Sequence, residues 1–181
     1  MNGTVRRRAG GFDISVGHSY GNCPKYIQKR QVHFLRDPNT VSSAPPRESS
    51  VPDEPTRALV EQADTFFVAS FIDLAEDRQV DVSHRGGLTG FVRIDGDGSL
   101  VIPDFAGNRF FNTLGNILLN PRTGLTFPDF ATGGLLQMTG DAELLFEPLH
   151  GHAVEGAERY WRFHPRRTVW RAQALPTCEP S

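Results

Sequence analysis

Apolar and polar positions alternate along several short stretches of this chain. Residues 12–20 read FDISVGHSY, in which aromatic, aliphatic and histidine positions alternate with small or polar ones. A period of two is typical of a β-strand with one buried face. Residues 65–72 (TFFVASFI) form an apolar run of strand length, rich in aromatic and β-branched residues, and predict another strand. Further strands are predicted at 79–83, 90–94, 99–103, 123–128, 135–145 and 168–175.

Two helices are predicted among these strands. Residues 108–120 have helical spacing, and Pro121 ends this helix because its ring cannot continue it. Four residues form one apolar stripe along it: Phe110, Phe111, Leu114 and Leu118. A shorter helix over roughly 55–64 is expected because a proline suits the first helical turn and Asp53 or Glu54 can cap it.

Together these elements predict an all-β fold with minor helices. Seven short strands follow the first helix, and the longer helix lies between the fourth and the fifth. Residues 95–98 (DGDG) are a strong hairpin signal, so adjacent strands are expected to run antiparallel. The unpaired backbone groups of an open sheet edge can pair with another chain, and small sheets of this kind usually avoid this by closing or folding on themselves. We therefore expect a mostly antiparallel β-barrel with a helix across one mouth.

A linker divides the chain. Residues 36–55 (RDPNTVSSAPPRESSVPDEP) are rich in proline, serine and charge, which indicates an exposed segment without regular structure. The expected organisation is an N-terminal strand and turn at 1–35, the linker, and a barrel domain at 56–181.

Composition and charge narrow the possible partners. The 181 residues carry a formal net charge of −2, which favours neither nucleic acid nor an anionic membrane as a partner. No apolar run has the length of a membrane span, and the three arginines at 6–8 precede no apolar signal-peptide core. Two isolated cysteines, Cys23 and Cys178, cannot build a disulfide framework or a metal cluster. We expect a cytoplasmic protein with reduced thiols.

Common catalytic motifs are missing from the sequence. There is no GxSxG, no HExxH and no GxxxxGKS phosphate loop. The pair His150 and His152 could ligate a metal, but no carboxylate or cysteine cluster accompanies it, so a solvated loop is the favoured interpretation. Residues 95–98 resemble the start of a calcium loop without its distal glutamate, and a hairpin explains them better.

Two segments have residues suited to binding an anion. The first ends a predicted strand and reads Ser83-His84-Arg85-Gly86-Gly87. Its glycines let a backbone approach a phosphate closely, and its guanidinium can clamp one with two hydrogen bonds. The alternative for this segment alone is a surface turn with a solvated arginine.

The second segment, Gly107-Asn108-Arg109, opens the predicted helix. Helix N-termini present free amides that bind phosphates, whereas a cation there is unfavourable unless an anion is shared with it. A surface turn is again the alternative. Together the two segments predict a phosphate-bearing ligand, with Asn112 and Asn116 available for polar contacts.

Most of the chain resembles the pyridoxamine 5′-phosphate oxidase-like flavin-binding split barrels. The resemblance lies in FFVAS (66–70), VDVSHRGG (80–87), GFVRI (90–94), LVIPDFAGNRFFNTLGNILLNPRTGLTF (100–127) and LLQMTGDAEL (135–144). The segment HSYGNCPKYIQKR (18–30) is similar to one in larger flavin-nucleotide-binding members, where it lies between two regions. Residues 1–30 are thus expected to be either the remnant of an upstream part or the start of a naturally short member.

The resemblance implies a split β-barrel that holds FMN noncovalently at the interface of a homodimer. It implies phosphate binding by His84, Arg85 and Arg109, and a position beside the isoalloxazine for Pro103, Asp104 and Phe105. Gln137 matches a position that can reach the cofactor. This sequence departs from the oxidases where Arg109 is followed by Phe110 instead of a second basic residue, so the vitamin B6 reaction is not carried over.

Three functions remain open at this stage. The first is an FMN-dependent oxidoreductase of unknown substrate, in which the flavin performs the redox chemistry and no protein nucleophile is needed. The second is a non-catalytic carrier or sensor of FMN or of haem, with His84 or His18 as an axial ligand. The third is a deazaflavin-dependent reductase on the same fold.

Overall fold

The computed structural model describes residues 2–21, 24–40, 42, 44–75, 77–107, 109–146 and 154–178. Within these residues the main sheet has eight strands. They are β4 (Arg47–Ser49), β5 (Thr65–Leu74), β6 (Asp77–Gly86), β7 (Arg93–Ile94), β8 (Leu100–Phe105), β9 (Arg122–Asp129), β10 (Gly134–Leu145) and β11 (Ala157–Arg171). Two small antiparallel pairs stand apart from this sheet: β1 (Asn2–Arg8) with β2 (Gly11–His18), and β3 (His33–Phe34) with β12 (Thr177–Cys178). The helices are α1 (Glu54–Gln62) and α2 (Asn112–Leu119).

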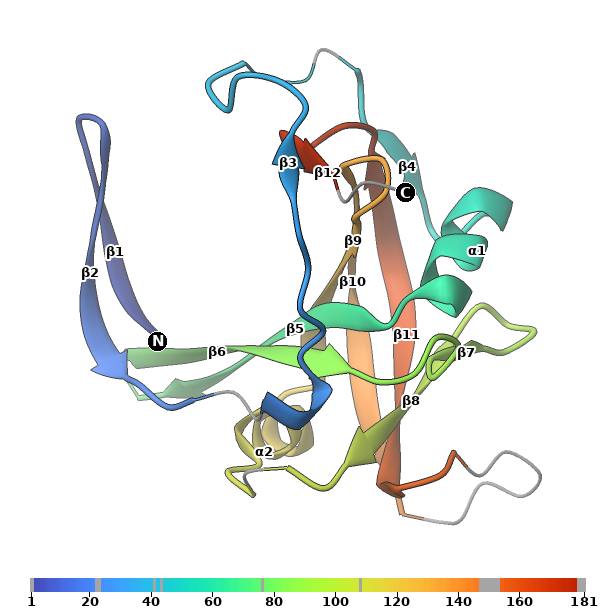
Figure 1. Cartoon of the computed structure of the whole chain (residues 1–181). Helices are drawn as coiled ribbons and strands as arrows, with labels where there is room; N and C mark the ends of the chain where they lie inside the picture. The colour runs from blue at the N-terminus through green and yellow to red at the C-terminus, as the bar shows by residue number, and fades with distance from the viewer. Residues whose placement is uncertain are drawn as a thin grey trace.

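The main sheet curls into a barrel. Its strand order is β6-β5-β9-β10-β11-β8-β7, with β4 also paired to β11, and every pair is antiparallel. In Figure 1, β10 and β11 cross β5 and β6 at a steep angle, and α2 lies at the lower end of the sheet. No ladder joins β6 to β7 within the described residues. The expected all-β, mostly antiparallel barrel with minor helices is confirmed.

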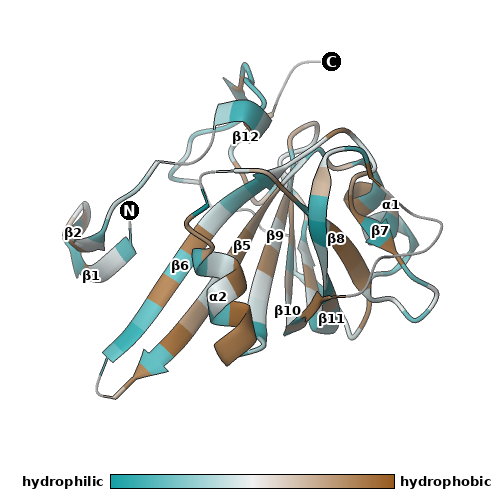
Figure 2. Ribbon diagram, turned by 90° about the horizontal axis from the view of Figure 1, so that it is seen from below, coloured by the Kyte–Doolittle hydropathy of each residue, from teal (hydrophilic) through white to brown (hydrophobic). Residues whose placement is uncertain are grey.

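The alternation of side chains along the strands builds the core. On β5, Phe66 and Val68 are fully buried while Phe67 between them is exposed, as the pleat requires. Phe66 stacks on Phe127 with ring centroids 4.9 Å apart and also contacts Phe91 and Trp161. On β6 the alternation is reversed, since the apolar Val80 and Val82 are exposed and the polar Asp81 is buried; Figure 2 shows hydrophobic and hydrophilic residues alternating along this strand. The core inside the curled sheet therefore joins this aromatic cluster to aliphatic side chains of the other strands and of both helices.

Helix α1 forms as its sequence predicts. The Asp53 carboxylate accepts a hydrogen bond from the Thr56 amide at 3.3 Å, and Pro55 occupies the first turn. This cap satisfies an amide that has no partner within the helix.

Helix α2 begins four residues later than expected. Arg109 and Phe111 both have left-handed backbones, with φ of 61° and 52°, so the right-handed helix cannot begin before Asn112. The expected apolar stripe is therefore wrong for three of its four residues. The buried face is Thr113, Leu114 and Ile117, whereas Phe110, Phe111 and Leu118 are exposed.

Several strands were missed or misplaced by the sequence pattern, among them β1, β3 and β12, for which no strand was predicted. The expected linker contains β4, which pairs with the last residues of β11. Strand β11 starts at Ala157, far before the predicted 168, and pairs first with β8. Because β8 and β4 share one edge of β11, the short β4 continues the sheet where β8 ends.

The N-terminal residues form an arm. The β1–β2 hairpin projects from the barrel in Figure 1, and its side chains are exposed on both faces, although β2 was expected to be half-buried. From there the chain runs to β3, which pairs with β12 near the C-terminus. None of the described helices is long and apolar enough to cross a membrane.

The aromatic core provides a stability prediction. Phe66→Ala should lower the free energy of unfolding by about 3–5 kcal/mol, because it empties a fully buried site between three other rings. Leu88→Ala, at a side chain that is 86% exposed, should change it by less than about 0.5 kcal/mol. Denaturant unfolding of both variants measures the difference. Equal stabilities would contradict this description of the core.

Candidate functional site

A pocket opens where the ends of β6 and β8, the segment before α2 and the N-terminal residues meet. Its cavity volume is about 110 Å³, within a wider hollow of about 910 Å³ that includes open solvent at its mouth. Nine of the twelve residues predicted for the site line it. They are Ser83, His84, Arg85, Gly86, Pro103, Asp104, Phe105, Arg109 and Asn112.

The other three predicted residues are not placed at this pocket. Asn108 lies outside the described residues. Asn116 faces the sheet, where its side-chain amide donates to Ser70 Oγ at 3.0 Å. Gln137 is exposed on β10 between the buried Leu136 and Met138, so it belongs to the outer face of the sheet.

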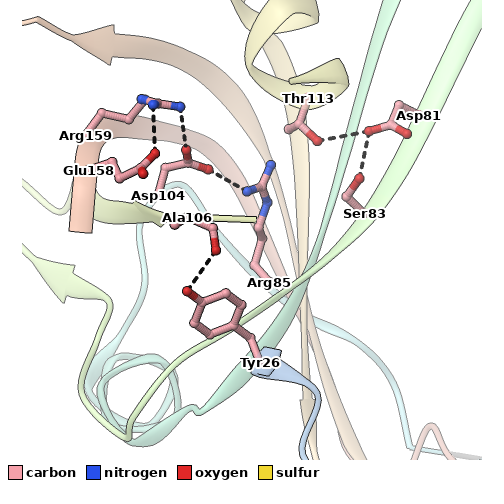
Figure 3. Close-up of polar contacts among 9 residues, drawn as sticks. All are labelled: Tyr26, Asp81, Ser83, Arg85, Asp104, Ala106, Thr113, Glu158 and Arg159. Carbon is pink, nitrogen blue, oxygen red and sulfur yellow. Dashed lines mark hydrogen bonds and ion pairs between the residues drawn. The ribbon is translucent and has the colours of Figure 1, made fainter. Parts of the chain in front are cut away.

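A carboxylate between two guanidinium groups forms one wall. Asp104 is only 6% exposed, and its two oxygens accept from Arg85 Nη1 at 2.7 Å and Arg159 Nη1 at 3.1 Å (Figure 3). Such charge-assisted bonds hold both guanidinium groups in defined positions. The Nε of Arg85 is buried and has no hydrogen-bond partner in the structure. An acceptor on a ligand would satisfy this donor, whose burial is otherwise unfavourable.

Arg159 is held by a second set of contacts. Its guanidinium lies 4.8 Å from the centre of the Phe111 ring and donates to Glu158 at 3.0 Å. A cation over an aromatic face is attracted by the ring quadrupole. Phe111, the residue with a left-handed backbone before α2, is thereby fixed to β11. Arg109, two residues earlier, forms no ion pair with any described residue and lies exposed at the pocket.

A different carboxylate anchors the opposite wall. Asp81 is 4% exposed and faces the same side of β6 as Ser83 and Arg85. It accepts four hydrogen bonds from neutral side chains, and Figure 3 shows two of them. The donors are Ser83 Oγ at 2.9 Å, Thr113 Oγ1 at 2.9 Å, Asn2 Nδ2 at 3.1 Å and the Tyr20 hydroxyl. The Asp81 carboxylate thus joins β6, α2 and the N-terminal arm.

Two tyrosines of the N-terminal segment were not predicted as site residues. Burial and the hydrogen bond to Asp81 raise the pKa of Tyr20, which keeps its hydroxyl protonated as a donor. Tyr26 donates to the Ala106 carbonyl at 3.0 Å (Figure 3). Its ring stacks on Phe105 with centroids 5.2 Å apart. Both tyrosines line the pocket. The only sequence signal for them was the similarity of residues 18–30 to flavin-nucleotide-binding proteins, which gave no position in space.

His84 faces both the pocket and the outside of the sheet. The centroid of its ring lies 5.7 Å from that of the Phe67 ring, in an edge-to-face arrangement, and Phe67 belongs to the outer face of β5. Burial and the neighbouring Arg85 cation lower the pKa of His84 below its ordinary 6.5. The imidazole is therefore neutral at pH 7.

The described part of the chain holds no group of three or more histidine, cysteine or acidic residues that could bind a metal. The pair His150 and His152, which raised a metal interpretation, lies outside the described residues, as does Cys23.

Known proteins resemble this chain through its fold. No protein-family model matches the sequence, and no curated protein matches it in sequence. The structure of HupZ from Group A Streptococcus superposes over 66% of this chain and 98% of its own, with a TM-score of 0.51 at 13% identity. A second HupZ structure superposes over 72% of this chain and all of its own with the same TM-score. The chain has the split-barrel fold.

More distant neighbours of this split barrel carry other names. The FAD-binding protein of Mycobacterium smegmatis covers 68% of this chain and 98% of its own, with a TM-score of 0.46 and 9% identity. A pyridoxamine 5′-phosphate oxidase-like protein of Corynebacterium glutamicum covers 70% of this chain and 97% of its own, with a TM-score of 0.43 and 13% identity. The split-barrel fold expected from the sequence is confirmed by the sheet topology and by the superpositions on HupZ.

The lowered pKa of His84 predicts a pH dependence of stability. The unfolded chain binds a proton at this residue near pH 6.5, and the folded chain binds it only at lower pH, so acid favours unfolding through this group. The contribution of His84 to the free energy of unfolding is present above about pH 6.5 and should be lost as the pH falls through the pKa of His84 in the folded chain. His84→Gln should lose less stability between about pH 7.5 and 5.5 than the wild type does, by denaturant unfolding. His33→Gln, at an exposed position, is the control, and equal losses in both variants would contradict the prediction.

Proposed function

We propose that this chain is an FMN-binding flavoprotein of oxidoreductase type, with the flavin in the pocket described above. One observation carries the proposal: the ends of two strands and the loop that follows the second of them meet at a single pocket. They are the SHRG end of β6, the PDF end of β8 and the segment holding Arg109. All three lie in stretches whose sequence resembles flavin-binding split barrels.

The residues present suit a flavin nucleotide. Arg85 offers a buried Nε–H without a partner, and Arg109 forms no ion pair with a described residue, so both can serve a phosphate. Tyr26, Phe91 and Phe105 give the pocket a flat aromatic side that suits the isoalloxazine.

The chain's own residues would bind and orient the cofactor. A bound flavin supplies the electron or hydride transfer, and the protein supplies position and electrostatics. Asp104 keeps Arg85 and Arg159 in place, and the neutral His84 can donate or accept a hydrogen bond at the pocket edge.

The phosphate contact is tested by removing Arg109. Arg109→Ala should weaken FMN binding about ten- to a hundredfold, because a hydrogen bond between charged groups contributes about 1.5–3 kcal/mol. Riboflavin lacks the phosphate, so it should bind both proteins equally and less tightly than FMN binds the wild type. Fluorescence titration of both flavins measures this. Arg78→Ala, whose guanidinium pairs with Asp73 at the far end of β6, is the matched control.

Three results would contradict the proposal. Wild-type protein that binds neither flavin would overturn it. An absorption spectrum of the purified protein with a haem Soret band, or with the single violet band of a deazaflavin, would replace FMN with that cofactor. Arg109→Ala that binds FMN as tightly as the wild type would remove this arginine from the phosphate site.

We also propose that the protein is a homodimer that covers the outer face of β5 and β6. On this face Val80 and Val82 are 48% and 53% exposed, and Phe67 is 37% exposed beside His84. An uncovered apolar patch of this kind marks an interaction surface. Because His84 reaches both this face and the pocket, a second copy here would lie at the edge of the flavin site.

A charge on this face should dissociate the dimer. Val82→Glu should be a monomer at micromolar concentration, because a buried unpaired carboxylate is strongly unfavourable in an interface. Leu88→Glu, in the loop after β6, should remain dimeric. Analytical ultracentrifugation separates the two states. A wild type that is monomeric with flavin bound would overturn the proposal.

A further inference from the structure

Among the described residues, the side-chain hydrogen bonds that hold the N-terminal arm to the barrel lie beside the candidate pocket. All residues of the β1–β2 hairpin after Asn2 are exposed. An isolated two-stranded hairpin is at best marginally stable in water, so its position depends on its contacts with the barrel. The contacts are made at its base, by Asn2 and Tyr20, and both reach Asp81.

Tyr20 connects the base of the arm to the pocket. Its hydroxyl donates to the buried Asp81 carboxylate, and its ring packs against Phe110 with centroids 5.6 Å apart. Thr113, at the start of α2, donates to the other oxygen of the same carboxylate. Docking of the arm and the position of the pocket wall therefore depend on one charged group.

Tyr26 makes a second connection six residues later. Its hydroxyl binds the Ala106 carbonyl and its ring stacks on Phe105, which follows Asp104 on β8. Its backbone lies against the end of β6: a Cβ on Gly86 would come within 2.2 Å of the Tyr26 carbonyl oxygen. Gly86 is therefore needed for the chain to pass this close. Residues 27–32, which follow, have no regular structure.

We propose that the N-terminal arm (residues 2–21) and the turn at 24–26 are a working part of the ligand site, and that ligand binding and docking of these residues are thermodynamically linked. The inference rests on the proposed flavin site. Tyr20 and Tyr26 act as positioning residues that close the pocket when they dock. A ligand that requires the closed pocket must favour the docked state, and by reciprocity docking must favour the ligand.

The chain contains its own reporters of docking. Lys25 is exposed and precedes Tyr26, so trypsin can cut after it once the segment leaves the pocket. Arg8 lies at the far end of the exposed hairpin and reports cleavage that needs no undocking from the pocket. Mass spectrometry resolves the two cleavage rates in one digestion of the full chain.

Without ligand, loss of a tyrosine hydroxyl should expose Lys25. Tyr20→Phe removes a hydrogen bond to a buried carboxylate and should speed cleavage after Lys25 about ten- to a hundredfold. Tyr26→Phe removes a hydrogen bond to a neutral carbonyl, so the rate of cleavage after Lys25 should rise only about two- to tenfold. The matched control is Tyr160→Phe. The Tyr160 hydroxyl accepts a hydrogen bond from the Val154 amide, and Tyr160 does not line the pocket. Trypsin should cleave this variant after Lys25 at the wild-type rate.

With FMN, the same site should be protected. At a concentration about a hundred times the dissociation constant, cleavage after Lys25 should slow by about a hundredfold, while cleavage after Arg8 stays unchanged. Wild-type protein that binds FMN but is cut after Lys25 at an unchanged rate would overturn the linkage and leave the proposed function intact. Tyr20→Phe and Tyr26→Phe that are both cut like the wild type would overturn the docking role. A wild type that binds no FMN would overturn the proposed function and the linkage together, whereas the ligand-free rates would still decide the docking role.

Discussion

The buried carboxylate of Asp81 is the constraint on which the pocket depends. A carboxylate taken out of water is strongly unfavourable unless its lone pairs are satisfied, and Asp81 has only neutral donors to satisfy it. Those donors come from β6, from the start of α2 and from the two ends of the N-terminal hairpin. The charge can be buried only when all three segments are in place. Since the alternation of β6 puts Ser83 and Arg85 on the same face as Asp81, the network also fixes the direction in which the SHRG segment points.

A second buried carboxylate, Asp104, is satisfied in the opposite way. Two guanidinium groups bind its oxygens, and one of them keeps a buried Nε–H without a partner. The wall around Asp81 therefore carries a negative charge among neutral groups, whereas the wall around Asp104 gathers the cations.

Sequence patterns predicted the elements whose signal is local. The apolar run of β5, the cap of α1 and the hairpin at 95–98 all depend on residues within a few positions of each other, and each is observed. The start of α2 could not be predicted, because left-handed backbones at Arg109 and Phe111 do not alter helical spacing. Tyr20 and Tyr26 were missed for another reason. They meet residues 61 and 80 positions away, and a contact of that range leaves no trace in a local pattern.

The strained segment before α2 shows how these distant contacts support the site. A non-glycine residue with a left-handed backbone costs about 1–3 kcal/mol, and such residues persist only where their surroundings over-determine them. Here Phe111 is held under Arg159, the neighbouring Phe110 packs on Tyr20, and Thr113 is bound to Asp81. Each of these partners comes from a different part of the chain, so the shape of the wall is set from outside the segment. The segment that carries Arg109 thus owes its conformation to β11, β6 and the N-terminal arm, and Arg109 is left at the pocket with its guanidinium exposed.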